Sequence, residues 1–429
     1  MTKDAANQAI KERKIAVIGA GTMGAGIAQT AAHAGFVVEM FDANPDLVRK
    51  AQAGIRAQLD KLVDKQKLLR HERDDIMERL RVAAGPAALK DVELVIEAVP
   101  EDLAIKRRVL AEAAAAAPAT AVLATNTSSI SIAKLAEGLP SPQRFIGLHF
   151  FNPAPVMKLL EIVSGPSTDA QTQVLGVAYA GAFGKTPIKV KDSPGFVVNR
   201  VARPYYLESL AMLEAGVADV QTIDAAMKSV GRFPMGPFEL LDLIGLDVNL
   251  AVTKTVHEGF GSPARFAPNP IQARLVEQGR LGRKTGRGFY DHSSQPPTRS
   301  FETPVRAADG WKPSPALSAY AAALSKPADR NFYLFARIMT AIINEAALAA
   351  ETIALPREVD LGMKLGLNFP EGPLEAADFA GLDVVLDLMR EFQAEDRSGR
   401  HDPAPLLQRH VRDGHLGEKV AHGFLRHSL

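Results

Sequence analysis

The chain of 429 residues contains no cysteine, and this absence removes several kinds of chemistry. Without thiols there is no disulfide, no thiolate metal site and no cysteine nucleophile, and a reducing compartment is compatible with the composition. An excess of charge of one sign is also missing, because 50 basic residues balance 49 acidic ones and leave a net charge of +1. Such a balance gives no general attraction to nucleic acid, so we expect no nucleic-acid partner.

Long apolar runs and hydrolase motifs are missing as well. The N-terminal segment MTKDAANQAIKERK is polar and charged, it has no apolar signal core, and no run approaches membrane-spanning length. The chain has no HExxH and no GxSxG, so metal-dependent and serine hydrolysis have no support, and no metal is expected. We expect a cytoplasmic protein with a short frayed N-terminus and no membrane partner.

What the chain does have is a glycine-rich turn after a short apolar strand, in the segment 14–42, KIAVIGAGTMGAGIAQTAAHAGFVVEMFD. In this G-x-G-x-x-G pattern Gly19 permits the tight turn, Gly21 lets a pyrophosphate approach the backbone, and Gly24 allows close helix–strand packing. The start of the following helix offers free N–H groups and a positive dipole end to phosphates. A second apolar run ends on Asp42, about 20 residues further on, where an acid can bind ribose hydroxyls. The pattern predicts dinucleotide binding.

Short β-rich runs alternate with helical stretches in the first part of the chain, which predicts a mainly parallel, doubly wound α/β sheet. The charged segment 54–82 is long for a single crossover, and it indicates either a projecting helical hairpin or a plain solvated helix pair. We expect strands at 14–20, 37–42, 93–99, 121–125, 144–150, 157–163 and 186–191, with helices that include 22–34, 45–63, 103–116 and 170–183.

After Pro194 the strand signals stop, and two motifs of the helical part occur twice. FPMGPFELLDLIGLDV at 233–248 returns as FPEGPLEAADFAGLDV at 369–384, and the motif at 278–292 returns at 412–427 with nearly the same offset. Two matches in the same order indicate a duplicated domain. We therefore expect a dinucleotide-binding domain at 1–192, all-α copies at 193–297 and 326–429, a linker at 298–325, and one long helix at 195–216.

A histidine and a glutamate on consecutive predicted strands could form a catalytic pair. His149 ends one strand, Glu161 lies within the next, and the connection between them is short. If the strands are neighbours, the two side chains can face each other. A carboxylate beside an imidazole fixes its tautomer and stabilises the imidazolium, which a dehydrogenase that oxidises a hydroxyl group needs. The alternative is a structural histidine at a strand end.

Four other polar residues are also candidates, and two of them allow two interpretations. Ser128, in the loop NTSS, could bind a substrate oxygen or cap the next helix. Asn199 could direct its amide at the substrate or nicotinamide, or only satisfy backbone groups at a helix start. Glu101 and Lys106, after the strand ELVIEAV, indicate a solvated helix start when taken alone.

Together these motifs resemble the 3-hydroxyacyl-CoA dehydrogenase family over about residues 12–292. The segments that carry the resemblance are VIGAGTMGAGIA, VIEAVPEDLAIK, NTSSI, GLHFFNPAPVMKLLEIV, DSPGFVVNR, MGPFELLDLIGLD and GRKTGRGFY. The duplicated C-terminal part is similar to the dehydrogenase part of bacterial multifunctional β-oxidation proteins.

The resemblance implies a role for each matching residue. His149 would be the catalytic base and Glu161 its partner, and Ser128 and Asn199 would hydrogen-bond the reacting oxygen and help place the substrate. The residues implied in binding NAD are Gly19, Gly21, Thr22, Met23, Gly24, Asp42, Glu101, Lys106 and Asn126.

For coenzyme A, the resemblance implies that the 54–82 hairpin helps to hold the substrate, with Lys65 as a contact to the phosphates. Two departures lie there, because KQK at 65–67 lacks the glycine that relatives often have between the lysines, and Gln58 stands at a family serine position. In the second helical copy Ala336 aligns with Asn199, so we expect no catalytic role for that copy.

The implied reaction is the reversible, NAD-dependent oxidation of a (3S)-3-hydroxyacyl-CoA, including 3-hydroxybutyryl-CoA, to the 3-oxoacyl-CoA. The alternatives are a hydroxy-acid dehydrogenase of the carnitine or gulonate type and a non-catalytic, crystallin-like protein. We expect the two helical copies to pack on each other through a pseudo-twofold interface, in a monomer with an internal pseudo-dimer or in a homodimer.

Overall fold

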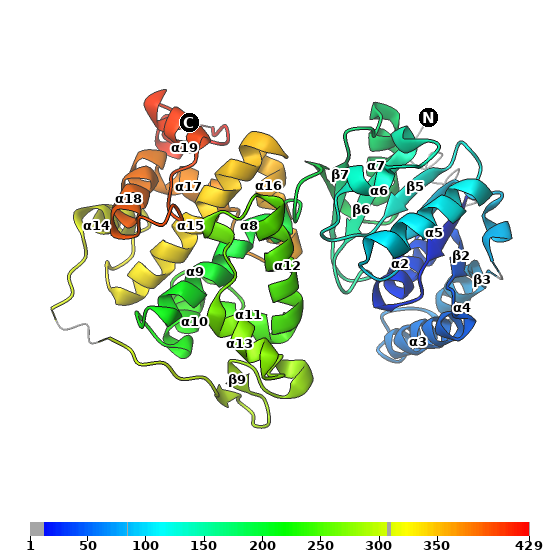
Figure 1. The fold of residues 1–429 in the computed structure, drawn as a ribbon, viewed down its shortest axis with the longest axis horizontal. Helices are drawn as coiled ribbons and strands as arrows, with labels where there is room; N and C mark the ends of the chain where they lie inside the picture. Colours follow the sequence, from blue (N-terminus) through cyan, green and yellow to red (C-terminus); the bar gives the residue numbers. More distant parts are fainter. Residues whose placement is uncertain (1–12, 84, 307–309, 429) are drawn as a thin grey trace. The chain divides into compact units, whose positions relative to one another are not determined.

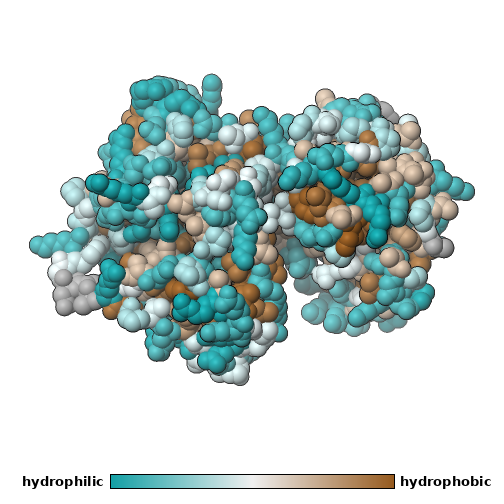
Figure 2. All heavy atoms as spheres, in the orientation of Figure 1, coloured by the Kyte–Doolittle hydropathy of each residue, from teal (hydrophilic) through white to brown (hydrophobic). Residues whose placement is uncertain are grey.

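The computed structural model describes residues 13–83, 85–306 and 310–428, which form two compact units (Figure 1). The first unit ends at Phe196 and the second begins at Val197. The frayed N-terminus expected from the sequence lies almost wholly outside the described residues. Polar residues cover most of the face shown in Figure 2, with smaller apolar patches among them.

The first unit is built on one eight-stranded sheet with the strand order β3-β2-β1-β4-β5-β6-β7-β8. All neighbouring strands pair in parallel except β6 and β7, which are antiparallel, and this confirms the mainly parallel, doubly wound sheet. The strands are β1 (Lys14–Ile18), β2 (Val37–Phe41), β3 (Leu80–Val82), β4 (Leu94–Glu97), β5 (Val122–Thr125), β6 (Phe145–Phe150), β7 (Leu159–Ser164) and β8 (Thr186–Lys191).

The central strands are buried along their whole length, which explains why they are continuous apolar runs in the sequence. Sequence analysis missed β3, since three residues at the sheet edge are too few to show a period. The helices of this unit are α2 (Thr22–His33), α3 (Pro45–Asp64), α4 (Arg70–Arg79), α5 (Leu103–Ala116), α6 (Ile132–Ala136) and α7 (Ala170–Ala182), with short 3-10 turns η1 (Pro86–Leu89) and η2 (Pro142–Arg144).

The charged segment predicted as a hairpin forms α3 and α4, which lie together beside β2 and β3 (Figure 1). Asn44 caps α3 by accepting a hydrogen bond from the N–H of Asp46, and Pro45 occupies the first helical position, where its missing N–H costs nothing. A single stripe of α3 is buried, and the rest of the helix is largely exposed. The hairpin is thus anchored along one side. The buried stripe consists of Val48, Ala51, Ile55 and Leu59.

The second unit is mostly helical and contains both sequence repeats. Most of its helices contact α15, whereas α11, α12 and α13 pack mainly on one another and on α9 (Figure 1). They are α8 (Val198–Val201), α9 (Arg203–Glu214), α10 (Val220–Ser229), α11 (Pro237–Ile244), α12 (Leu246–Gly259), α13 (Pro270–Glu277), α14 (Pro315–Ala323), α15 (Arg330–Thr352), α16 (Pro356–Leu367), α17 (Pro373–Ala380), α18 (Leu382–Glu395) and α19 (Pro405–Arg412), with 3-10 turns η3 (Ala264–Phe266), η4 (Arg283–Thr285) and η5 (Glu418–Val420).

Helix α15 corrects the statement that no segment approaches membrane-spanning length. Its 23 residues are long and apolar enough to cross a membrane by length and composition alone. However, 78% of its most apolar window is buried inside the structure, as in the core helix of a globular unit. Polar residues such as Arg337 and Glu345 interrupt the apolar sequence of this helix, so it does not form one continuous apolar run.

The expected long helix at 195–216 is wrong in two respects. The chain becomes helical only at Val198, and it is interrupted at Ala202, so that α8 and α9 replace one helix. Pro204 explains the interruption, because its nitrogen cannot donate to the carbonyl of Arg200 and its ring crowds that carbonyl.

The segment expected as a linker contains regular structure. Residues Tyr290–Asp291 and Thr298–Arg299 form a short antiparallel pair, β9 and β10, which is a small exception to the all-α prediction. Further on, Ser314 caps α14 by accepting a hydrogen bond from the N–H of Leu317. The Pro- and Ser-rich composition had suggested an irregular segment, but serine followed by proline is also a helix start.

The two repeats contact each other through a reciprocal pair of buried ion pairs. Arg200 of the first copy lies 2.5 Å from Glu345 of the second, and Arg337 of the second copy lies 2.5 Å from Glu208 of the first. Arg337 and Glu345 follow Arg200 and Glu208 by the same offset that separates Ala336 from Asn199. Each copy therefore gives the other the same pair of charges, which is the pattern of an isologous twofold interface within one chain.

Candidate active site

Two of the three glycines after β1, Gly19 and Gly24, are required for steric reasons, and the third, Gly21, faces open space. Gly19 has φ +106°, and a Cβ there would lie 2.5 Å from the carbonyl oxygen of Ala98. A Cβ at Gly24 would lie 1.8 Å from the carbonyl oxygen of Gly19, whereas one at Gly21 would meet nothing within 4 Å. The tight turn and the close helix packing are thereby confirmed. The open space at Gly21 is where a phosphate could approach the backbone.

The start of α2 and the end of β2 add groups suited to a dinucleotide. Among the described residues no side chain caps α2, so the N–H groups at Thr22 and Met23 in its first turn are available to an anion. Asp42 accepts a hydrogen bond from the N–H of Ala20 (2.8 Å), which holds its carboxylate beside the glycine loop. Donors for phosphates and an acceptor for ribose hydroxyls therefore lie together, and the chain's residues fit NAD.

His149 and Glu161 face each other across the antiparallel pair β6–β7, as the sequence predicted. The two residues are direct partners in the strand register, and Nδ1 of His149 lies 2.5 Å from Oε2 of Glu161. Both are buried, with His149 6% exposed and Glu161 0%. The rings of Phe151 and Phe196 lie 4.6 and 5.7 Å from the imidazole and exclude water from its sides. Because Glu161 engages Nδ1, Nε2 is the nitrogen left to exchange a proton.

The loop after β5 is organised around the carboxylate of Glu101. Its Oε1 accepts hydrogen bonds from the hydroxyl of Thr127 (2.7 Å) and from the N–H of Ser128 (2.9 Å), and the Ser128 hydroxyl lies 3.3 Å away. Burial alone would raise the pKa of Glu101, but Lys106 and these donors hold it below its ordinary value. The helix-cap interpretation of Ser128 is wrong, because Ser131 caps α6.

Lys106 is not part of a solvated helix start. Its side chain is 1% exposed, and its ammonium lies 2.8 Å from Glu97 and 3.3 Å from Glu101. Glu97 also accepts hydrogen bonds from the hydroxyl of Thr125 (2.7 Å) and from the N–H of Val99 (2.7 Å). The sequence analysis did not identify this residue. The available signal was an acidic residue at the end of the apolar run LVIE, with a lysine nine positions later.

Three other predicted site residues have different surroundings. Asn126 accepts a hydrogen bond from the N–H of Phe150 (2.9 Å) and so ties the end of β5 to the end of β6, next to His149. Lys65 is exposed at the end of α3. Asn199 lies in α8 of the second unit, so its role beside the first-unit residues stays a prediction.

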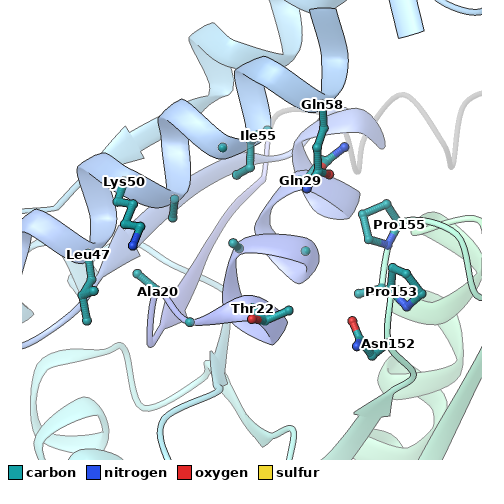
Figure 3. A pocket seen from close by; sticks show the side chains of 16 residues that line it. Ala20, Thr22, Gln29, Leu47, Lys50, Ile55, Gln58, Asn152, Pro153 and Pro155 are labelled. Carbon is teal, nitrogen blue, oxygen red and sulfur yellow. The ribbon is translucent and has the colours of Figure 1, made fainter. Parts of the chain in front are cut away.

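A pocket of about 370 Å³ opens beside the glycine loop in the first unit (Figure 3). One wall is the side of α3 that runs from Leu47 to Gln58, a second is the start of α2, and the third is the loop 152–155 that joins β6 to β7. Figure 3 shows the side chain of Lys50 directed from α3 toward Ala20, and Gln58 near Gln29. Gln58, one of the two places where the sequence departs from the pattern of the family that it resembles, therefore lies in the pocket wall.

Two family models match the chain. The family model described as 3-hydroxyacyl-CoA dehydrogenase, NAD binding domain, matches residues 14–193. The model of the C-terminal domain of 3-hydroxyacyl-CoA dehydrogenase matches twice, at residues 195–292 and 333–427, which confirms the duplication.

Individual proteins match over most of their length. The 3-hydroxyadipyl-CoA dehydrogenase of Escherichia coli K12 is 36% identical over 93% of this chain and 97% of its own. The probable 3-hydroxybutyryl-CoA dehydrogenase of Bacillus subtilis is 40% identical over 66% of this chain and 98% of its own. A crystal structure of 3-hydroxybutyryl-CoA dehydrogenase from Escherichia coli K12 matches with a TM-score of 0.83 at 36% identity, covering 94% of this chain and 99% of that one.

Proposed function

The chain belongs to the 3-hydroxyacyl-CoA dehydrogenase family, and on that premise we propose that it oxidises a (3S)-3-hydroxyacyl-CoA reversibly to the 3-oxoacyl-CoA, with NAD. The observation that carries the proposal is the buried contact of 2.5 Å between His149 and Glu161, in the unit that also holds the glycine loop. A water-excluded imidazole with a carboxylate on Nδ1 is the base that alcohol oxidation requires.

In the proposed reaction His149 takes the hydroxyl proton on Nε2 as the alcohol carbon loses its hydride. NAD supplies the hydride acceptor. Glu161 stabilises the imidazolium that forms, and because it is held in the strand register it also fixes the plane of the ring. In the reverse direction the imidazolium returns the proton to the carbonyl oxygen.

We assign Ser128 and Asn199 to the reacting oxygen. Ser128 is suited to this role because Glu101 holds it in place through its backbone N–H (2.9 Å), while the contact with its hydroxyl is longer (3.3 Å). The ion pairs of Lys106 with Glu97 and Glu101 hold the Glu101 carboxylate in place, and Glu101 in turn orders the loop that carries Ser128. Lys106 is therefore proposed to act on the cofactor site chiefly by fixing Glu101.

The pocket beside the glycine loop is the proposed place for the coenzyme A part of the substrate. Lys50 provides a cation in its wall, and Lys65 is exposed on the same helix for contact with phosphates. The names of the relatives support acyl groups such as 3-hydroxybutyryl and 3-hydroxyadipyl, and both are substrates to test.

The direct test is the oxidation of NADH with acetoacetyl-CoA, followed by absorbance. We expect turnover that depends on the CoA ester and is lost in His149→Gln. The same assay with free acetoacetate, and with carnitine or gulonate and NAD in the forward direction, tests the hydroxy-acid alternatives. Activity with a free acid and not with the ester would contradict the proposal, and inactivity with every substrate would favour the crystallin-like alternative.

A further inference from the structure

A buried lysine outside the catalytic pair holds the connection between the two catalytic strands. Lys185 lies between α7 and β8 and is 8% exposed. Its ammonium donates hydrogen bonds to the carbonyl oxygens of Ala154 (2.6 Å) and Met157 (2.7 Å). Burial lowers the pKa of this lysine, and none of the carboxylates in the described part of the chain is paired with it.

A buried ammonium without a carboxylate partner is costly unless other groups replace its hydration. Here the two carbonyl oxygens replace the water that would hydrate the ammonium. Both come from one short segment, residues 152–157. That segment can satisfy the ammonium only when both carbonyls point inward. Lys185 therefore selects one conformation of the segment, and that conformation in turn makes the burial of the charge tolerable.

The segment 152–157 is also a wall of the proposed substrate pocket. Asn152, Pro153, Ala154 and Pro155 line the pocket, and Figure 3 shows the labelled members of this set opposite α3. The segment packs closely on α2, since a Cβ added at Gly26 would lie 3.2 Å from the side chains of Ala154 and Pro155. The segment therefore has no room to move toward α2, so a rotation of the two carbonyl groups changes the shape of the pocket.

We propose that Lys185 is a positioning residue that fixes the segment 152–157 as the wall of the acyl-CoA pocket. Lys185 does not line that pocket, and it acts through the carbonyl oxygens of Ala154 and Met157. The proposal rests on the proposed function for its choice of ligand, but the ordering of the segment can be measured without any substrate.

The test compares Lys185→Met with Lys185→Arg and with Lys158→Met in the full-length protein. Methionine keeps the apolar length and removes the charge and donors, arginine keeps both, and Lys158 is an exposed lysine of the same strand connection. We expect Lys185→Met to raise the KM for acetoacetyl-CoA about tenfold, the effect of losing charge-assisted hydrogen bonds, with little change in the KM for NADH. Lys185→Arg should recover most of the loss, and Lys158→Met should match the wild type.

Hydrogen exchange of the substrate-free protein supplies the second measurement. The N–H groups of Val156 and Met157 both donate to the carbonyl oxygen of Pro153, and their exchange should accelerate in Lys185→Met. Unchanged exchange together with an unchanged KM for acetoacetyl-CoA would overturn the inference, and so would equal changes in both KM values or a Lys185→Met chain that does not fold. A wild-type protein without activity would instead contradict the proposed function, whereas the exchange result would still decide the role of Lys185.

Discussion

The two helical copies of the second unit share a scaffold but not a candidate catalytic residue. In each copy a fully buried aspartate, Asp242 or Asp378, accepts two backbone hydrogen bonds and contacts Nε2 of a histidine near the end of that copy. Asn199, in contrast, aligns with Ala336, which has no side-chain amide. The groups around the two aspartates are Phe289, Tyr290 and His292 in the first copy and Phe424, Leu425 and His427 in the second.

The comparison shows what the repeated motifs are for. The motif that ends in GFYDH in the first copy and GFLRH in the second brings its backbone N–H groups to a buried carboxylate, which is a requirement of folding. A motif can therefore identify the family and persist in a copy that has lost its candidate catalytic residue. Only residues that differ between the copies, such as Asn199, can report on the reaction.

The largest expected effect separates a catalytic histidine from a scaffold histidine. We expect His149→Gln to lower kcat about 10²–10⁴-fold, the usual cost of losing a general base, with a much smaller change in KM. His427→Gln changes the scaffold histidine of the second copy, which contacts Asp378, and should leave kcat unchanged. Steady-state kinetics with acetoacetyl-CoA and NADH measures both, and near-normal turnover of His149→Gln would remove the base from its role.

The reciprocal ion pairs should dominate the stability of the second unit. Glu345→Gln leaves Arg200, which is 3% exposed, without its counter-charge, and this should lower the free energy of unfolding by about 3–5 kcal/mol. Glu208→Gln should have a similar but smaller effect, because Arg337 then keeps only its longer contact with Glu395 (3.8 Å). Urea unfolding measures both losses.

An exposed pair provides the control for this prediction. Asp383→Asn breaks the contact with Lys419, whose side chain is 44% exposed, and should cost no more than about 1 kcal/mol. Deletion of residues 326–429 removes Glu345 and Arg337 together and should cause dimerisation, aggregation or instability. A truncated chain that stays monomeric, active and equally stable would show that the second copy is not a built-in partner.

Substitutions at the position where Asn199 aligns with Ala336 sharpen the comparison. Asn199→Ala should lower kcat about ten- to a hundredfold, because a hydrogen bond to an oxygen that gains negative charge is lost. Ala336→Asn restores the amide in the second copy and should change neither kcat nor KM. If Asn199→Ala behaves like the wild type, the first copy is a scaffold as well.

The smallest effect concerns pH and two equivalent carboxyl groups. Burial raises the pKa of Asp224 and of Asp360 to about 7, above the value of 3.8 for an unperturbed aspartate. Between these pH values the folded chain keeps protons that the unfolded chain releases, so these groups make the free energy of unfolding fall as pH rises from about 4 to about 7. Asp360→Asn should remove part of that fall, seen as a smaller difference between urea midpoints at pH 5 and pH 7.

Asp224 is the matched case in the first copy, because the hydroxyl of Tyr290 donates to it (2.7 Å) and the residue equivalent to Tyr290 is Leu425. In Tyr290→Phe, the fall in the free energy of unfolding that is due to Asp224 should therefore continue above pH 7. The contribution of Asp360 should not change. An identical pH dependence in the wild type and Asp360→Asn would show that Asp360 titrates at its ordinary pH.

The contact between His149 and Glu161 could be predicted from the sequence because it is local. His149 and Glu161 lie on consecutive strands with a short connection, so their meeting needed only one assumption about pairing. The support behind Ser128 was not predictable in the same way, because Glu97, Lys106 and Thr125 come from three elements, and their meeting depends on the strand order β4–β5 and on the packing of α5. Local signals also failed where two were in competition, as at Pro204 within an otherwise helical run.

The antiparallel pairing of β6 with β7 has a consequence for how such a chain can evolve. A base and its carboxylate that are carried by one hairpin travel together, whatever is appended to or exchanged within the rest of the polypeptide. Duplication of the helical region thus added about a hundred residues without separating the two groups on which the proposed reaction depends. Because β6 and β7 keep His149 and Glu161 together, the sequences of the two helical copies can change without separating this pair.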